Sequence, residues 1–352
     1  MRIMHIIWSL NLGGAESMLV DIINEQVRTE KVFLLIVNSE VQPELIKNIS
    51  QKVEIITINR TSGSRNIWNI FKINYHIYRI SPDIIHCHEW NLIKIVNFNR
   101  YKKVITVHDV NIEFNGYLKK FHRIFAISNA VNEDISKRGY GYKPVTVYNG
   151  IDFSKIKKRQ DYNYDIFKII QIGRLFHEKK GQNILLTALK IIVSDYEIKN
   201  IKIDFIGKGS SLYYLKELRK KLGLNEYCTF NGEQSREFIH NNLKKYNLLV
   251  QPSRYEGFGL TVVEAIAAKI PVLVSNIYGP MEIIRNGKYG YFFETEDAKD
   301  CANKIIKIMG DYKRQDFKDK METNYRFVKK YFDIKQTAKN YIDEYRKILG
   351  KK

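Results

Sequence analysis

At 352 residues the chain exceeds the usual size of one domain, and its length favours two. A hydrophobic content of 44%, with 6 prolines and 20 glycines, is typical of a folded globular protein and excludes a disordered one. The formal net charge of +20 favours anionic partners: nucleic acid, nucleotide phosphates or an anionic membrane surface. The 3 cysteines form no CxxC pair, which indicates buried thiols in a reducing compartment.

The first half of the chain alternates short apolar runs with amphipathic stretches of helix length. Met4–Leu10 is interpreted as a buried first strand rather than a signal peptide, because His5 and Ser9 interrupt it and no small-residue cleavage site follows. Further strands are predicted at Lys31–Asn38, Val53–Ile58, Asp83–His88, Lys103–His108, Arg123–Ser128 and Pro144–Tyr148. This β-α-β alternation predicts a mostly parallel sheet.

The charged segment Lys155–Asp165 has no apolar period and is interpreted as a linker. Strands are then predicted at Phe167–Ile172, Ile201–Ile206, Cys228–Asn231, Leu248–Gln251 and Pro271–Ser275. We therefore expect an α/β protein with two Rossmann-like, doubly wound domains facing a cleft. The expected boundaries are 1–155 for an acceptor-side domain and 156–325 for a donor domain. A basic helical tail, 326–352, is expected to pack partly back on the first domain. No apolar run is long enough to span a membrane.

The most informative motif is Glu256-Gly-Phe-Gly-Leu-Thr-Val-Val-Glu264. It predicts a strand, a glycine loop and a helix, so that backbone amides and the positive end of the helix dipole point at an anion such as a diphosphate. The amides would belong to Phe258, Gly259 and Leu260. Glu256 and Glu264 would lie on one side of the loop and accept hydrogen bonds from sugar and ribose hydroxyls. The alternative is that both carboxylates are solvated or cap the helix.

A second motif, Gly173-Arg174-Leu175 with Lys180-Gly181, directly follows the strand predicted at Phe167–Ile172. Arg174 can bind phosphate oxygens as a bidentate fork and Lys180 as a point charge, which would neutralise a leaving diphosphate. An ordinary solvated basic cluster is the alternative. Lys179 is adjacent, and the sequence does not choose between the two lysines.

Three histidines stand at strand ends in the first half: His86, His88 and His108. His86-Cys87-His88-Glu89 suggests a metal, but the sequence identifies no further ligands, so we expect no metal site. His108 is better placed to contact a sugar. Upstream, Gly13-Gly14-Ala15-Glu16 opens the first helix, where the glycines allow a turn close to phosphate; a simple tight turn is the alternative.

A family resemblance rests on six motifs that occur in one order. They are Gly13-Gly14-Ala-Glu16, Thr106-Val-His108-Asp109, Asn149-Gly-Ile-Asp152, Gly173-Arg-Leu with Lys180-Gly181, Glu256-Gly-Phe-Gly with Glu264, and Asn286-Gly-Lys-Tyr-Gly290. Together they resemble the group 1 glycosyltransferases of the GT-B fold, family GT4, over nearly the whole chain.

The resemblance implies a retaining enzyme that needs no metal or other cofactor, and the chain has no Asp-x-Asp motif. It also implies roles for individual residues. Arg174 and Lys180 would hold the donor diphosphate beside Gly173, and Glu256 would contact the transferred sugar. The remaining roles fall to Glu264 at the ribose, to Phe258, Gly259 and Leu260 as backbone donors, to His108 at the sugar or leaving group, and to Gly14 at the phosphate pocket.

The expected reaction moves a hexose or N-acetylhexosamine from a nucleotide sugar, most commonly a UDP-sugar in this family, to a glycan or lipid-linked acceptor. By analogy this fits bacterial capsule, O-antigen or exopolysaccharide synthesis by a cytoplasmic enzyme at the inner face of the cell membrane. Tyr117–Phe125 and Arg100–Lys103 mix basic and aromatic residues, and we expect them to face anionic lipid; an ordinary solvated helix is the alternative.

Two other classes of function remain as alternatives. A sugar-nucleotide epimerase or hydrolase could use the same fold. A nucleic-acid-binding protein is favoured only by the charge, because no helix-turn-helix or RNA-recognition signature is present, so nucleic acid is not an expected partner.

Overall fold

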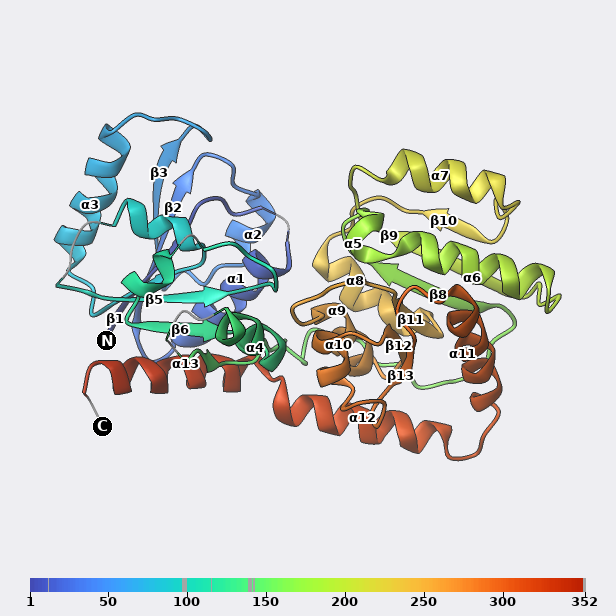
Figure 1. Ribbon diagram of the computed structural model, residues 1–352. Coiled ribbons are helices and arrows are strands. Elements are labelled where there is room, and N and C mark those ends of the chain that lie inside the picture. The colour runs from blue at the N-terminus through green and yellow to red at the C-terminus, as the bar shows by residue number, and fades with distance from the viewer. Residues whose placement is uncertain (12, 97–99, 115, 139–140, 142, 351–352) are drawn as a thin grey trace. The chain divides into compact units, whose positions relative to one another are not determined.

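The computed structural model describes residues 1–11, 13–96, 100–114, 116–138, 141 and 143–350 (Figure 1). The chain divides into two compact units. Unit 1 comprises Met1–Ile151 and Phe332–Lys352, and unit 2 comprises Asp152–Tyr331. The chain therefore passes from unit 1 to unit 2 and returns to unit 1 for its last helix.

Unit 1 is built on a seven-stranded sheet with the order β3-β2-β1-β4-β5-β6-β7, in which every pairing is parallel. The strands are β1 (Arg2–Ile7), β2 (Lys31–Asn38), β3 (Glu54–Arg60), β4 (Ile84–Cys87), β5 (Lys102–Val107), β6 (Arg123–Ala126) and β7 (Val145–Thr146). Near-continuous apolar runs such as β2 are buried on both faces because helices cover a parallel sheet on both sides.

The unit 1 helices are α1 (Gly14–Gln26), α2 (Pro43–Lys47), α3 (Trp68–Ile80), α4 (Asn129–Lys137), α13 (Ile334–Ile348) and the 3-10 turns η1 (Trp90–Lys94) and η2 (Tyr117–Lys120). The C-terminal α13 packs against α1. Its buried Tyr341 and Tyr345 reach the sheet, where their hydroxyls bond to Thr106 and His86. The end of the chain thus completes the core of the first unit.

Unit 2 has a six-stranded sheet with the order β10-β9-β8-β11-β12-β13, also parallel throughout. The strands are β8 (Phe167–Ile172), β9 (Ile201–Ile206), β10 (Cys228–Phe230), β11 (Leu248–Gln251), β12 (Val272–Ser275) and β13 (Tyr291–Phe293). The helices are α5 (His177–Lys180), α6 (Gln182–Ser194), α7 (Leu212–Lys221), α8 (Arg236–Asn242), α9 (Leu260–Ala267), α10 (Tyr278–Ile283), α11 (Ala298–Asp311), α12 (Phe317–Tyr331) and η3 (Leu243–Lys245).

The segment interpreted as a linker is packed against unit 2 instead. Arg159 is buried, and its guanidinium donates hydrogen bonds to the carbonyl oxygens of Asp161, Tyr246 and Asn163. The Tyr162 hydroxyl bonds to the carbonyl of Lys269. The segment has no helix or strand, and its one buried charge is Arg159, whose guanidinium satisfies backbone acceptors in the interior of unit 2.

The helical tail is two helices rather than one, and the return to unit 1 comes at Phe332, not at residue 326. α12 ends at Tyr331, and α13 begins at Ile334 because the Asp333 side chain accepts a hydrogen bond from the Lys335 amide and caps the new helix. The preceding α12 packs against α9 in unit 2. In the part of the chain that the structure describes, no helix is both long and apolar enough to cross a membrane.

Candidate active site

The carboxyl ends of β8 and β11 carry the two strongest sequence motifs. These strands are neighbours in the unit 2 sheet, although β9 and β10 extend from one side and β12 and β13 from the other. Such a reversal of strand order leaves a crevice at the strand ends, where open α/β sheets bind ligands. Gly173 and Arg174 follow β8, and the loop that contains Glu256 follows β11. The topology therefore brings both motifs to one place.

Lys180, in α5, forms an ion pair with Oε2 of Glu256. The same carboxylate oxygen accepts hydrogen bonds from Gln251 Nε2 at 3.1 Å and Ser253 Oγ at 3.5 Å. Lys179 points elsewhere, since its Nζ lies 4.8 Å from the centre of the Tyr255 ring. Of the two adjacent lysines, Lys180 is the one beside Glu256.

Arg174 is exposed at the end of β8. Its carbonyl accepts a hydrogen bond from Gln182, and its side chain has no ion-pair partner among the described residues. Because its guanidinium is not held in an ion pair there, it can bind a phosphate without first breaking an internal salt bridge. The carbon atoms Cε and Cδ of Lys180 lie within 4 Å of the position that a Cβ on Gly173 would take, so the basic pair flanks this glycine.

The glycine loop is shaped by two close constraints. Gly259 caps α9 with a φ of +114°, a backbone conformation that side chains rarely adopt. Gly279, at the start of α10, packs on the loop so closely that a Cβ would lie 2.9 Å from the Gly257 carbonyl carbon and the Phe258 nitrogen. The loop backbone and the first turn of α9, which begins at Leu260, are therefore held in one conformation, and a helix N-terminus of this kind can receive an anion. The Phe258 side chain is buried.

Glu264 lies one turn into α9 and is buried. Its Oε1 is 3.1 Å from His240 Nε2 and 3.4 Å from Arg236 Nε, both in α8. Burial would raise the pKa of this carboxyl, but the hydrogen bond from His240 and the charge of Arg236 together lower it below its ordinary value. The two glutamates of the motif thus have separate partners. Sequence reasoning missed His240 and Arg236, which belong to no motif.

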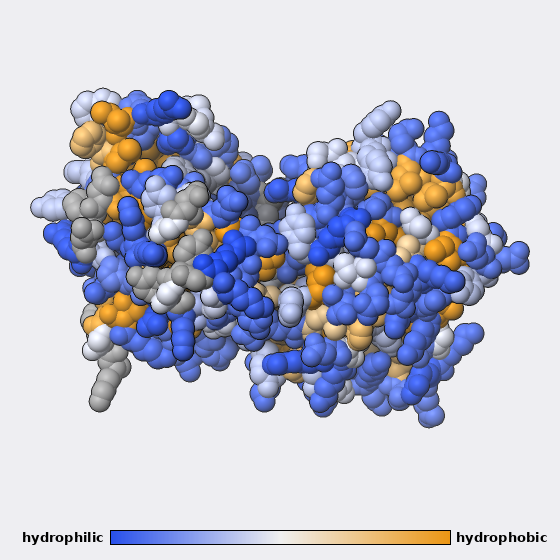
Figure 2. Space-filling view, in the orientation of Figure 1, coloured by the Kyte–Doolittle hydropathy of each residue, from blue (hydrophilic) through white to orange (hydrophobic). Residues whose placement is uncertain are grey.

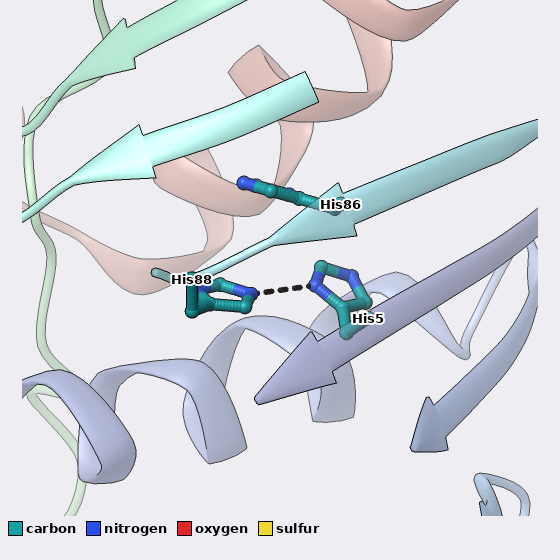
Figure 3. A group of neighbouring side chains, drawn as sticks. All are labelled: His5, His86 and His88. Atoms are coloured by element: carbon teal, nitrogen blue, oxygen red, sulfur yellow. Dashed lines mark hydrogen bonds between the residues drawn. The ribbon is translucent and has the colours of Figure 1, made fainter. Parts of the chain in front are cut away.

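In unit 1 the candidate side chains are histidines that gather where the strand order of the sheet reverses, between β1 and β4. His5 in β1 pairs in register with His86 in β4, and His88 follows β4 (Figure 3). His5 Nδ1 lies 3.0 Å from His88 Nε2, and His88 Nδ1 lies 3.4 Å from His108 Nε2. Burial lowers the pKa of His5 and His108 to about 4, and it lowers those of His86 and His88 well below the usual value. All four rings are therefore neutral at physiological pH.

The hydrogen bonds set the tautomers of this chain of rings. Gln26 Oε1 can only accept, so His5 Nε2, at 2.8 Å, carries a proton and His5 Nδ1 accepts from His88 Nε2. His88 Nδ1 then accepts from His108 Nε2. This leaves Nδ1 of His108 as an unprotonated acceptor, buried and without a hydrogen-bond partner within the described part of the chain.

His5 joins His86 and His88 as a third possible metal ligand, which the sequence did not identify. Nitrogens of His5, His86 and His88 lie within 4.8 Å of one another, and neutral imidazoles can bind metal. However, every ring nitrogen of the three has a protein partner; those of His86 bond to Tyr345 and Thr106. The arrangement fits a hydrogen-bonded network better than a metal site.

Unit 1 also contains a cavity of about 360 Å³ beside these histidines. Its polar and aromatic lining includes Trp8, Glu16, His88, Glu89, Trp90 and His108. Burial raises the pKa of Glu89 to about 8, so much of this carboxyl is protonated at neutral pH. Gly14 begins α1, is exposed, and directly precedes Ala15 and Glu16, which line this cavity. Sequence reasoning had treated Glu89 only as part of a metal motif.

The fold and these groups define a class of protein, the glycosyltransferases, and the comparisons with known proteins agree. The model of the glycosyl transferases group 1 matches residues 152–325, and that of glycosyltransferase family 4 matches residues 12–155. Together the two matches account for most of both units. The chain therefore belongs to the group 1 glycosyltransferases, family 4.

Individual relatives place it more closely. A 41.2 kDa protein in the cps region of Klebsiella pneumoniae is 26% identical, over 88% of this chain and 93% of the relative. The capsular polysaccharide biosynthesis glycosyltransferase CapM of Staphylococcus aureus is 30% identical over 54% of this chain, and the match spans half of CapM. The Anabaena protein HepE, solved in complex with UDP and glucose, superposes with a TM-score of 0.82 over 97% of this chain and 98% of HepE at 20% identity, which shows the GT-B fold.

Proposed function

We propose that this chain is a retaining, metal-independent glycosyltransferase that moves a hexose or N-acetylhexosamine from a UDP-sugar to a glycan or lipid-linked acceptor in bacterial surface polysaccharide synthesis. The observation that carries the proposal is the meeting of two motifs at the neighbouring ends of β8 and β11, where Lys180 pairs with Glu256. Arg174 directly follows β8, and the glycine loop leads into the N-terminus of α9. The capsule-related relatives support the pathway, and the UDP complex of HepE supports the nucleotide.

In the proposed reaction the bond between the sugar and the diphosphate breaks, a bond to an acceptor oxygen forms, and the acceptor proton passes to the departing phosphate. Arg174, Lys180 and the α9 amides would neutralise the negative charge that develops on the diphosphate. Such fixed positive charges can replace a metal ion in this role. Glu256 would accept hydrogen bonds from the sugar hydroxyls, and Lys180 would exchange part of its contact with Glu256 for a phosphate oxygen.

Glu264 would hold the ribose, because it is ionised and held in place by His240 and Arg236. In unit 1 we propose that the cavity lined by Trp8, Trp90 and Glu89 receives the acceptor, since aromatic faces and a protonated carboxyl suit a hydroxylated ligand. His108 would contact the sugar or the leaving group. The enzyme would work in the cytoplasm at a membrane surface that bears the acceptor.

A thermal-shift screen across UDP-, GDP- and ADP-sugars tests the donor, because a ligand that binds only the folded state raises its stability. We expect UDP-sugars to raise the melting temperature, and Arg174→Ala to reduce that shift strongly. A response to GDP- or ADP-sugars alone would overturn the choice of nucleotide. Product analysis then tests the reaction: free sugar or an epimerised nucleotide, formed without a glycosylated acceptor, would favour the epimerase or hydrolase alternative.

A further inference from the structure

The helix α3 of unit 1 exposes an unusual amount of aromatic surface. Ile67, Trp68, Phe71, Tyr75 and Tyr78 are each at least 60% exposed. The aromatic residues are three or four positions apart, so they share one face of the helix, while Ile73 and Ile77 on the opposite face are buried. Figure 2 shows hydrophobic surface gathered over α3 and the turn before it. A contiguous patch of this kind marks an interaction site rather than random exposure.

The charged residues of α3 and of the segment that leads into it are all basic. Between Glu54 and Asp83 the chain has no acidic residue. Arg65, Lys72 and Arg79 are exposed there. Lys72 and Arg79 are helical neighbours of the aromatic positions, and the Arg100 guanidinium lies 5.3 Å from the centre of the Tyr78 ring. Basic side chains interleaved with Trp, Tyr and Phe on one face are typical of a helix that lies in the interface of an anionic bilayer.

The segments that the sequence had suggested for membrane contact do not offer such a face. Leu118, Phe121 and Phe125 are buried, and so are Tyr101 and Lys103. Phe125 lies in β6, and Tyr101 directly precedes β5, so these aromatic side chains form core beside the sheet. Lys119 and Lys120 remain at the surface of these segments, and Tyr117 is only partly exposed.

We propose that α3 is a membrane-docking helix whose aromatic face enters the interface of an anionic lipid bilayer while Lys72 and Arg79 contact lipid phosphates. This deepens the membrane contact in the proposed function by naming the surface and its partner. It does not depend on the donor or the reaction, so vesicle binding and transfer activity can fail independently. With docking through α3, unit 1 would be held at the surface where a lipid-linked acceptor resides.

The test is co-sedimentation of the full chain with vesicles of phosphatidylcholine alone or mixed with phosphatidylglycerol. We expect salt-sensitive binding only to the anionic vesicles, reduced about tenfold or more by Trp68→Ser with Phe71→Ser and also by Lys72→Glu with Arg79→Glu. The matched controls are Tyr196→Ser with Tyr213→Ser and Lys216→Glu with Lys220→Glu, which change exposed residues of unit 2 and should bind like the wild type. Melting temperature and circular dichroism check that every variant is folded.

A second measurement locates the contact. Lipids brominated in the acyl chain should quench tryptophan fluorescence in the wild-type protein, and Trp68→Phe should bind equally well but lose most of the quenching. No binding to anionic vesicles, or equal binding by the α3 variants and the controls, would overturn the proposal. A concentration-dependent dimer that the Trp68→Ser, Phe71→Ser variant abolishes would assign the face to a second copy instead, and binding to nucleic acid but not vesicles would assign it to a nucleic acid.

Discussion

Lys180 and Glu256 form an ion pair although they are 76 residues apart in the chain. The lysine ends a single-turn helix after β8, and the glutamate belongs to the glycine loop after β11. In the proposed function both groups meet the donor, the lysine at the diphosphate and the glutamate at the sugar. Because the two charges also satisfy each other, each holds the other in position within the site.

The adjacent lysines provide a matched pair for mutation. Lys180→Ala is expected to lower kcat/KM by roughly a hundredfold, since losing one group that stabilises developing charge costs about 3 kcal/mol of barrier. Lys179→Ala should stay within about threefold of the wild type, because its ammonium lies against Tyr255 rather than Glu256. Initial rates with the donor found by thermal shift measure both. Equal losses in the two variants would contradict the assignment of Lys180.

His240 is expected to position Glu264 rather than to contact the reacting atoms. Removing its hydrogen bond in His240→Ala lets burial raise the pKa of Glu264, so more of the carboxyl is protonated at a given pH. As the pH is lowered, the affinity for UDP should therefore begin to fall at a higher pH in this variant than in the wild type. Calorimetric titration across the pH range measures this affinity. His240→Gln keeps a donor and should restore much of the profile. An identical pH profile in all three proteins would rule this role out.

Glu89 should make the protein less stable as pH rises. Its unfolded pKa is near 4.5 and its folded pKa about 8, so between these values the unfolded carboxyl loses a proton that the folded one retains. The free energy of unfolding therefore falls through this range, by up to a few kcal/mol. Glu89→Gln removes the titration while keeping an acceptor for the Trp8 amide. Melting temperatures of this variant and of the exposed control Glu113→Gln, measured across the range, should diverge as pH rises.

The buried histidines give the opposite dependence. Their folded pKa values lie below the unfolded value of 6.5, so from that pH down to about 4 the unfolded state takes up protons that the folded state does not. The contribution of these histidines to stability is therefore complete above pH 6.5 and is lost on acidification. In histidine-labelled protein, NMR should show the buried rings neutral at pH 6.5.

The same NMR spectra test the tautomers. His5, His88 and His108 should each carry the proton on Nε2 in the wild type. Gln26→Leu removes the acceptor that sets this direction, so the tautomer populations should change as far away as His108. A change in tautomer confined to His5 would show that the tautomers of the three rings are not coupled through their hydrogen bonds.

The sequence could predict the local elements because the preference for a strand or a glycine loop depends on residues that are close together in the chain. The predicted bounds of Lys31–Asn38, Phe167–Ile172, Ile201–Ile206 and Leu248–Gln251 are confirmed, since apolar and β-branched residues dominate each short run. β1 lies at Arg2–Ile7 rather than Met4–Leu10, because the chain leaves the sheet at Trp8. β13 was not predicted, because three residues carry too little periodicity.

The sequence by itself determined the alternation of strands and helices, the glycine loop before α9 and the order of the family motifs, because backbone preference and side-chain period act over a few residues. Only the tertiary structure decided which distant groups meet. Strand order brings Lys180 to Glu256, His5 to His88 and His240 to Glu264, and no local pattern encodes these contacts. It also decided which aromatic residues remain at the surface, burying Phe121 and exposing Trp68, because burial depends on what packs above a face.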